Sequence, residues 1–332
     1  MVKQCFKVLA LTLLHAASAL AAGAAHGVPP KSEAETYAGW RAAAARALAA
    51  RGNAPSLATA AGLTFVGSPS RSKSDTAKAA SAALEIAAKA SELAPDDAAI
   101  SWLHLQLCAD APGCDIRDAA TTMRWVDADN GAAWLPTLAA AQKDRDTVQV
   151  DRVLADMAQG ARFDLYGNRT AVRMFDALKG ARGALPPNYL ASDLTRLTEA
   201  MGIAGAVVMP SFSPLINACR EAAATERREA CLKLSKTMQR ADAVMAQLVG
   251  FAIEKRLTSS DGKLRSIAER RRLLEWRVSA ANQSDTPLLP WLRNARARSR
   301  LAKMRAMPRE EDVYIALLRE HGLPLDPPED RR

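Results

Sequence analysis

The sequence predicts an all-α protein in which stacked helical hairpins continue into a C-terminal helical bundle. Three observations support this fold class. The chain is rich in Ala and Leu with only 5% aromatic residues, its apolar residues recur at steps of three and four, and two segments near its middle resemble each other. Runs of alternating β-branched residues, which are typical of strands, are missing from the sequence.

The two related segments lie between residues 95 and 157. Pro95–Leu103 and Asp127–Leu135 align at an offset of 32, so that Trp102 corresponds to Trp134. A second apolar helix follows each segment, and these two helices align at an offset of 34. One helical hairpin cannot bury its own apolar face, whereas two stacked hairpins can. We therefore expect two hairpins packed side by side.

The acidic turn followed by a Trp one turn into a helix resembles the opening of a tetratricopeptide repeat. The resemblance covers residues 95–157 and implies a superhelix whose groove holds a protein or peptide near Trp102, Trp125 and Trp134. Pro136 lies inside the first helix of the second unit, where it removes an intrahelical hydrogen bond, so we expect a kink there. The alternative interpretation is an irregular helical bundle with Trp102 and Trp134 in its core.

Residues 1–24 have the features of a cleavable secretory signal peptide. Lys3 and Lys7 precede the apolar run Val8–Ala22, which ends in the small residues that a signal peptidase reads. This run is too short to span a bilayer comfortably. We expect cleavage near Ala21 or Ala24 and a periplasmic or secreted protein without a transmembrane span.

Four cysteines remain after cleavage, and their spacing predicts two local disulfides. An even number of cysteines in an exported protein is typical of a disulfide framework. Cys108 and Cys114 flank a short turn, while Cys219 and Cys231 are twelve residues apart. On one continuous helix, twelve residues would span about 18 Å, which is beyond the reach of a disulfide. The chain must therefore reverse near residues 223–226 if the second pair forms.

Gly and Pro divide the rest of the chain into further helices. The cluster between Gly180 and Pro187 is the best internal boundary, which gives a hairpin region over residues 32–180 and a C-terminal helical region over residues 188–325. In the second region one apolar stripe has helical spacing and is expected to face the core. Its members are Cys231, Leu234, Met238, Ala241, Met245, Leu248 and Ala252.

Positive charge is concentrated in the C-terminal third. The whole chain carries a formal charge of +9, and residues 263–309 hold thirteen Lys and Arg against three acidic residues. Arg293, Arg296, Arg300 and Lys303 fall on one face of an expected helix. Such a face is suited to an anionic envelope surface or an acidic protein. The alternative is a solvated face whose cations pair with acidic residues of neighbouring helices.

Catalytic and cofactor motifs do not stand out in the sequence. Ser70-Arg71-Ser72-Lys73 matches S-x-x-K, but its usual downstream partner motifs are missing. No His has ligand spacing to a partner, so no metal or other cofactor is expected. The basic stretch also lacks the interleaved aromatic residues that stack on bases, which argues against nucleic acid.

These observations lead to two hypotheses about function. The first is a non-enzymatic periplasmic binding or scaffold protein that presents its helical hairpins to a protein or peptide. The second is a cell-envelope hydrolase whose site is assembled from scattered residues. The second hypothesis predicts a deep pocket that holds at least two close acidic or His side chains with perturbed pKa values.

Overall fold

The protein is all-α, which confirms the predicted fold class. The computed structural model describes residues 31–67, 73–181, 193–220, 225–284 and 290–328. These residues form fifteen α-helices and one short 3-10 helix. Within the described ranges, β-structure is limited to a single isolated bridge between Asn130 and Arg162. The predicted signal peptide, residues 1–24, lies outside the described residues.

Three N-terminal helices form the first layer. They are α2 (Lys31–Ala49), α3 (Ala54–Gly67) and α4 (Lys73–Leu93). Helices α2 and α4 both pack against α3, which is buried along most of its length. Many of the buried side chains on these helices are alanines. Because alanine is small, the three helices can pack closely.

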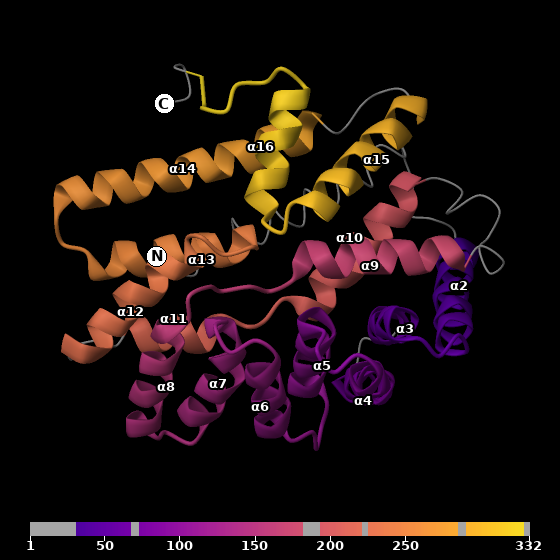
Figure 1. Cartoon of the computed structure of the whole chain (residues 1–332), viewed down its shortest axis with the longest axis horizontal. Helices are drawn as coiled ribbons and strands as arrows, with labels where there is room; N and C mark the ends of the chain where they lie inside the picture. Colours follow the sequence, from indigo (N-terminus) through magenta and orange to yellow (C-terminus); the bar gives the residue numbers. More distant parts are fainter. Residues whose placement is uncertain (1–30, 68–72, 182–192, 221–224, 285–289, 329–332) are drawn as a thin grey trace.

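Helices α5 to α8 stand side by side, and we call them the hairpin row (Figure 1). The row consists of α5 (Ala98–Asp110), α6 (Ile116–Val126), the 3-10 helix η1 (Gly131–Trp134), α7 (Leu135–Lys143) and α8 (Thr147–Gln159). The polar turns of the sequence supply the N-caps of these elements, since a side-chain oxygen there accepts hydrogen bonds from the first free backbone amides. The capping residues are Asp97, Asp115, Asn130 and Asp146.

The two Trp-bearing segments occupy different surroundings in this row. Trp102 lies inside α5 and is fully buried, and its indole Nε1 donates to the backbone oxygen of Val208 at 2.9 Å. Trp134 ends η1 and is half-buried. The prediction of a kink at Pro136 is wrong, because the α-helix begins only at Leu135. Pro136 therefore lies in the first turn, where its missing N–H breaks no intrahelical hydrogen bond.

Both predicted disulfides are present. The disulfide between Cys108 and Cys114 joins the end of α5 to the segment just before α6, across the intervening turn, with the two Cα atoms 5.4 Å apart. Cys219 and Cys231 join α11 (Ser213–Arg220) to α12 (Thr225–Met238), with a Cα separation of 5.7 Å. The separation requires the expected chain reversal, although residues 221–224 lie outside the described ranges.

The apolar stripe that begins at Cys231 is divided between two helices. Helix α12 ends at Met238, and α13 (Val244–Leu257) packs back against it. The close approach depends on Gly250, because a Cβ there would lie 2.7 Å from the backbone oxygen of Ser235. As a result Ala252, at the end of the predicted stripe, is exposed.

The remaining helices lie above the hairpin row in the view of Figure 1. They are α9 (Gly167–Gly180), α10 (Asp193–Val208), α14 (Asp261–Ser284), α15 (Pro290–Ala306) and α16 (Glu310–Glu320). Of these, α9 and α10 pack against α5. The main cluster of buried apolar residues runs from Trp40 to Leu318 and so includes residues on both sides of the boundary expected near residue 180. Among the described residues no single helix has the length and apolarity to cross a membrane, although α10 and α11, bent by 47°, meet that test together.

Candidate functional site

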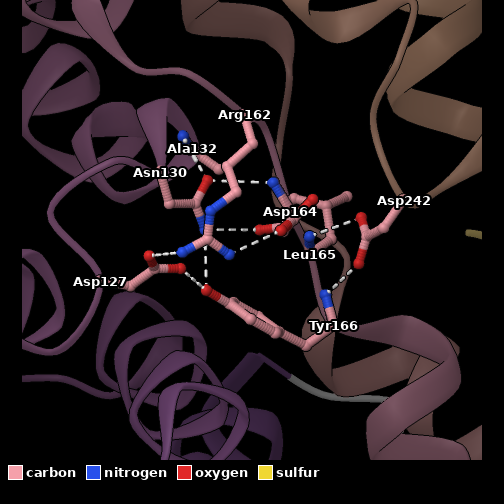
Figure 2. A network of polar contacts seen from close by, with 8 residues as sticks. All are labelled: Asp127, Asn130, Ala132, Arg162, Asp164, Leu165, Tyr166 and Asp242. Atoms are coloured by element: carbon pink, nitrogen blue, oxygen red, sulfur yellow. Dashed lines mark hydrogen bonds and ion pairs between the residues drawn. The ribbon is translucent and has the colours of Figure 1, made fainter. Parts of the chain in front are cut away.

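A network of polar side chains, most of them buried or partly buried, connects the hairpin row to the C-terminal helices (Figure 2). Its members come from the turn between α6 and η1, from the connection between α8 and α9, and from the turn between α12 and α13. We call this network the junction, and it comprises Asp127, Asn130, Arg162, Asp164, Tyr166 and Asp242.

Asn130 lies at the centre of the junction and is only 1% exposed. Its Nδ2 donates to the backbone oxygen of Asp164 at 2.9 Å and to the Tyr166 hydroxyl at 3.0 Å. Its Oδ1 accepts from the backbone amides of Ala132 at 3.1 Å and Asp164 at 3.0 Å. These contacts use both donors and both acceptor positions of the side-chain amide. Asn130 therefore fixes the connection before α9 against the start of η1.

Asp127 is the acceptor for two further members of the junction. It pairs with the guanidinium of Arg162 and accepts a hydrogen bond from the Tyr166 hydroxyl. Arg162 also contacts Asp164 at 3.0 Å. Burial, followed by the hydrogen bond to Asp127, raises the pKa of Tyr166 above its usual value. The Tyr166 hydroxyl therefore remains a hydrogen-bond donor at all ordinary pH values.

At the junction, two glycines allow the backbone at the start of η1 to lie against the backbone at the end of α8. The amide of Gly131 donates to the Arg162 oxygen at 2.9 Å. A Cβ on Gly131 would lie 2.7 Å from the Met157 oxygen, and one on Gly160 would lie 2.7 Å from the Gly131 nitrogen. No larger residue fits at either position without a shift of backbone atoms.

Asp242 connects the junction to the N-terminus of α9. Its two carboxylate oxygens accept from the amides of Leu165 and Tyr166, each at 2.7 Å. Tyr166 has a φ of 58° and caps α9 without a side-chain hydrogen bond. This left-handed conformation is uncommon for a non-glycine residue, and the carboxylate holds it by binding both amides. The carboxylate also occupies the positive end of the helix.

Burial raises the pKa of Asp242 to about 8, and the negative charge of Asp164 adds to this shift. The hydrogen bonds from the two backbone amides oppose it, while the charge of Glu310 acts in the same direction as burial. Glu310 accepts from the amide of Val244 at 2.8 Å, and its own amide donates to the backbone oxygen of Asp242 at 2.7 Å. The junction thus reaches the start of α16.

A pocket of about 310 Å³ opens beside the junction and is lined in part by Asp164, Asp242 and Arg169. The two acids that line this pocket, Asp164 and Asp242, already bind other groups of the protein. Both oxygens of Asp242 are engaged with amides and the residue is 5% exposed, while Asp164 pairs with Arg162. Geometrically, the junction holds three segments of the chain together and presents no free acid to a bound molecule.

The three tryptophans expected at a partner-binding groove differ in how far their side chains are exposed. Trp102 is 0% exposed and therefore is not a surface residue, whereas Trp125, at the end of α6, is 86% exposed. The guanidinium carbon of Arg124 lies 4.3 Å from the centre of the Trp134 ring, which is thus partly covered. Trp125 is the most exposed of the large apolar side chains within the described ranges.

The four basic residues expected on one face of α15 also differ in exposure. Arg300 is 8% exposed and donates to Asn282 at 2.9 Å, so it faces inward. Arg293 and Arg296 are half-buried, and Lys303 pairs with Glu320. Several other cations of this third pair with acids on other elements, among them Arg270 with Glu254, Arg277 with Glu311, Arg298 with Asp193 and Arg305 with Asp176.

Sequence reasoning did not identify the junction, whose members are spread over more than one hundred positions of the chain. The one local signal was Asn130-Gly131, a dipeptide that marks turns. In the part of the chain that the structure describes, no three His, Cys, Asp or Glu residues are arranged to hold a metal ion. No protein-family model, curated protein or solved structure matches this chain.

Proposed function

We propose that the protein is exported and acts as a non-enzymatic binding or scaffold protein of the cell envelope, with its hairpin row as the surface for a protein or peptide. Its helical hairpins would then serve in the manner of degenerate tetratricopeptide-type repeats. The two disulfides favour an oxidising compartment. This environment agrees with the secretory signal that the first 24 residues predict.

The observation that carries the proposal is the exposure of Trp125. A Trp that is 86% exposed contributes nothing to the core, and Trp is enriched among the residues that dominate binding energy at protein interfaces. Two neighbours extend the surface it offers, because Trp134 and the Arg124 that covers it lie on the same part of the row. The junction fixes η1, the element that carries Trp134.

A photo-crosslinking experiment tests the proposal in the cells that make the protein. A photoreactive phenylalanine derivative replaces Trp125 in one variant and Glu269, an exposed residue of α14, in the control variant. We expect a discrete protein adduct at position 125 and none of that mass at position 269. The partner identified from the adduct should bind the purified protein, and Trp125→Ala should weaken this binding at least about tenfold, as truncation of an interface hot spot does.

Two results would contradict the proposal. One is the absence of any adduct at position 125, and the other is an identical set of adducts at both positions. Trp125→Ala should also leave the free energy of unfolding within about 0.5 kcal/mol of the wild type, because an exposed side chain makes few folding contacts. This control separates lost binding from lost folding.

The pocket beside the junction is the reason to consider a second candidate function, that of a cell-envelope hydrolase. The pocket is lined by two acids, Asp164 and Asp242, and the pKa of Asp242 is raised, which meets part of what that hypothesis predicts. The test is release of soluble fragments from purified cell-envelope polysaccharide by the wild type and by Asp164→Asn. Release that the substitution abolishes, in a variant that still folds, would favour the hydrolase over the scaffold.

A further inference from the structure

A groove of about 760 Å³ lies among the three N-terminal helices, far along the chain from the junction. Its floor is α3, and its walls are α2 and α4, which both pack on α3. Leu63 and Thr64 line the floor, Ala45 and Ala49 line the α2 side, and Ile86 lines the α4 side. The volume falls in the range of about 300 to 1,000 Å³ that is typical of small-molecule sites.

The groove exists because its walls are built from small residues. Alanine side chains on α2 and α4 end at Cβ, so they cannot reach across α3 to meet each other. The exposed lining is mainly apolar, apart from Thr64 and the charged residues at the rim. An apolar occupant would therefore remove that lining from water, at about 25 cal/mol for each Å² buried.

Two cations face this groove from opposite walls. Arg46 belongs to the last turn of α2 and Lys78 to α4, and both line the groove while remaining exposed. Neither has an acidic partner among the described residues. The other charged lining residue, Asp75, already has an interaction of its own. The rim is thus positively charged, in contrast to Arg41, one turn earlier on α2, which is bound to Glu199 at 2.7 Å.

The volume of the groove argues for a small occupant. A partner helix is about 10 Å across and would use this volume in roughly two turns, which is a short contact for a protein partner. A single aliphatic chain is thinner and can lie along α3. The combination of a small, mainly apolar space and a cationic rim matches a molecule with one aliphatic chain and one anionic end.

We propose that the groove binds a free long-chain carboxylic acid, with the aliphatic chain on α3 and the carboxylate between Arg46 and Lys78. Charge-assisted contacts to a carboxylate are stronger than neutral hydrogen bonds. The two cations therefore set a preference for the acid over the alcohol of equal length. This inference is independent of the scaffold function, since it uses other helices and another class of ligand.

A competition experiment on the purified, disulfide-bonded protein tests the inference. In this assay the neutral fluorescent probe N-phenylnaphthylamine is added first, and palmitic acid or hexadecanol is then added as the competitor. We expect saturable displacement by both, with palmitic acid the stronger competitor by about tenfold, as two partly exposed charge contacts would give. The double substitution Arg46→Glu with Lys78→Glu should remove the preference and leave the affinity for hexadecanol within about twofold.

The matched control is Lys255→Glu with Arg265→Glu, which reverses two exposed cations elsewhere on the surface. It should retain the preference for the acid. Ala42→Trp places a large ring at an exposed position of the groove wall and should weaken displacement by both competitors. This variant keeps the test decisive if the double charge reversal does not fold.

Several outcomes would overturn the inference. One is that palmitic acid displaces no probe in a saturable way, and another is that its advantage over hexadecanol survives the charge reversal at the rim. A protein that sediments with phosphatidylglycerol vesicles but does not bind monomeric palmitic acid would recognise a membrane surface instead. None of these outcomes bears on the crosslinking experiment at Trp125.

Discussion

The junction and the N-terminal groove both lie where several segments of the chain meet, but they differ in how tightly those segments pack. At the junction, chain segments meet so closely that two positions accept only glycine, and Asn130 makes all the hydrogen bonds its side chain can form. At the groove, alanines hold three helices together at their contacts and leave a space of about 760 Å³ beside them. The difference predicts that the junction tolerates almost no change, whereas the groove accepts added volume.

At a fixed pH, the largest loss of stability should come from Asn130→Ala. The substitution leaves two backbone amides and one backbone oxygen at the junction without their partner, and each buried unsatisfied group costs about 1 to 3 kcal/mol. We expect a loss of about 3 to 4 kcal/mol in the free energy of unfolding. Urea denaturation followed by circular dichroism measures it. Asn217→Ala, at a half-buried position of α11, is the control, and a loss below about 1 kcal/mol at Asn130 would contradict this account of the junction.

Adding one methyl group at Gly131 should have the next largest effect. Its Cβ would lie 2.7 Å from the Met157 oxygen, so the backbone has to move, and overpacking of this kind costs about 1 to 3 kcal/mol. The matched control is Gly205→Ala in α10, where a Cβ would meet nothing within 4 Å. That change should stabilise the protein by about 0.5 to 1 kcal/mol through helix propensity. Equal and small effects at the two glycines would argue against close contact at Gly131.

The third prediction concerns pH and Asp242. Its pKa is about 8 in the folded protein and about 3.9 when unfolded, so between these values the folded state binds more protons. Stability should therefore decrease as pH rises from about 4 to 8, by at most about 1.4 kcal/mol per pH unit for this one group. The measurement is the free energy of unfolding of the wild type minus that of Asp242→Asn at pH 5, 6, 7 and 8.

Subtraction is needed because other groups titrate in the same range. Burial lowers the pKa of His104, which makes stability rise with pH, and it raises the pKa of Glu310, which acts in the direction of Asp242. We expect the difference between the two proteins to shrink steadily from pH 5 to pH 8. A difference that stays constant would mean that Asp242 is ionised throughout, with its two amide donors outweighing burial.

The fold could be predicted from the sequence to the extent that local chemistry determines it. The helical class and both disulfides follow from spacing and residue type. The break between Met238 and Val244 could not be predicted, because the apolar spacing continues across it. The second half of the stripe instead packs back against the first with a close approach at Gly250, a contact between segments that periodicity does not encode.

The junction was beyond sequence reasoning for the same reason. Asp127, Tyr166 and Asp242 each lie in a polar or turn context that is common on surfaces, and only the fold brings them together. The burial of Trp102 was equally hidden, whereas Trp125 lies opposite the stripe that α6 buries at Ala119, Ala120 and Met123, so its exposure agrees with helical spacing. A single sequence identifies which residues can form such contacts, whereas the long-range packing decides which of them do.

The smallest effect should come from Ala79→Leu on the wall of the groove. Ala79 is half-buried and lines the open space, so three added carbons can extend into it without displacing a neighbour, and Leu is almost as favourable as Ala in a helix. We expect the free energy of unfolding to change by less than about 0.5 kcal/mol. The comparison with Gly131 is then direct, because one carbon at the junction should cost several times more than three carbons at the groove. A loss above about 1 kcal/mol, measured by the same urea titration, would mean that the space is closed in solution and that an aliphatic chain has no room there.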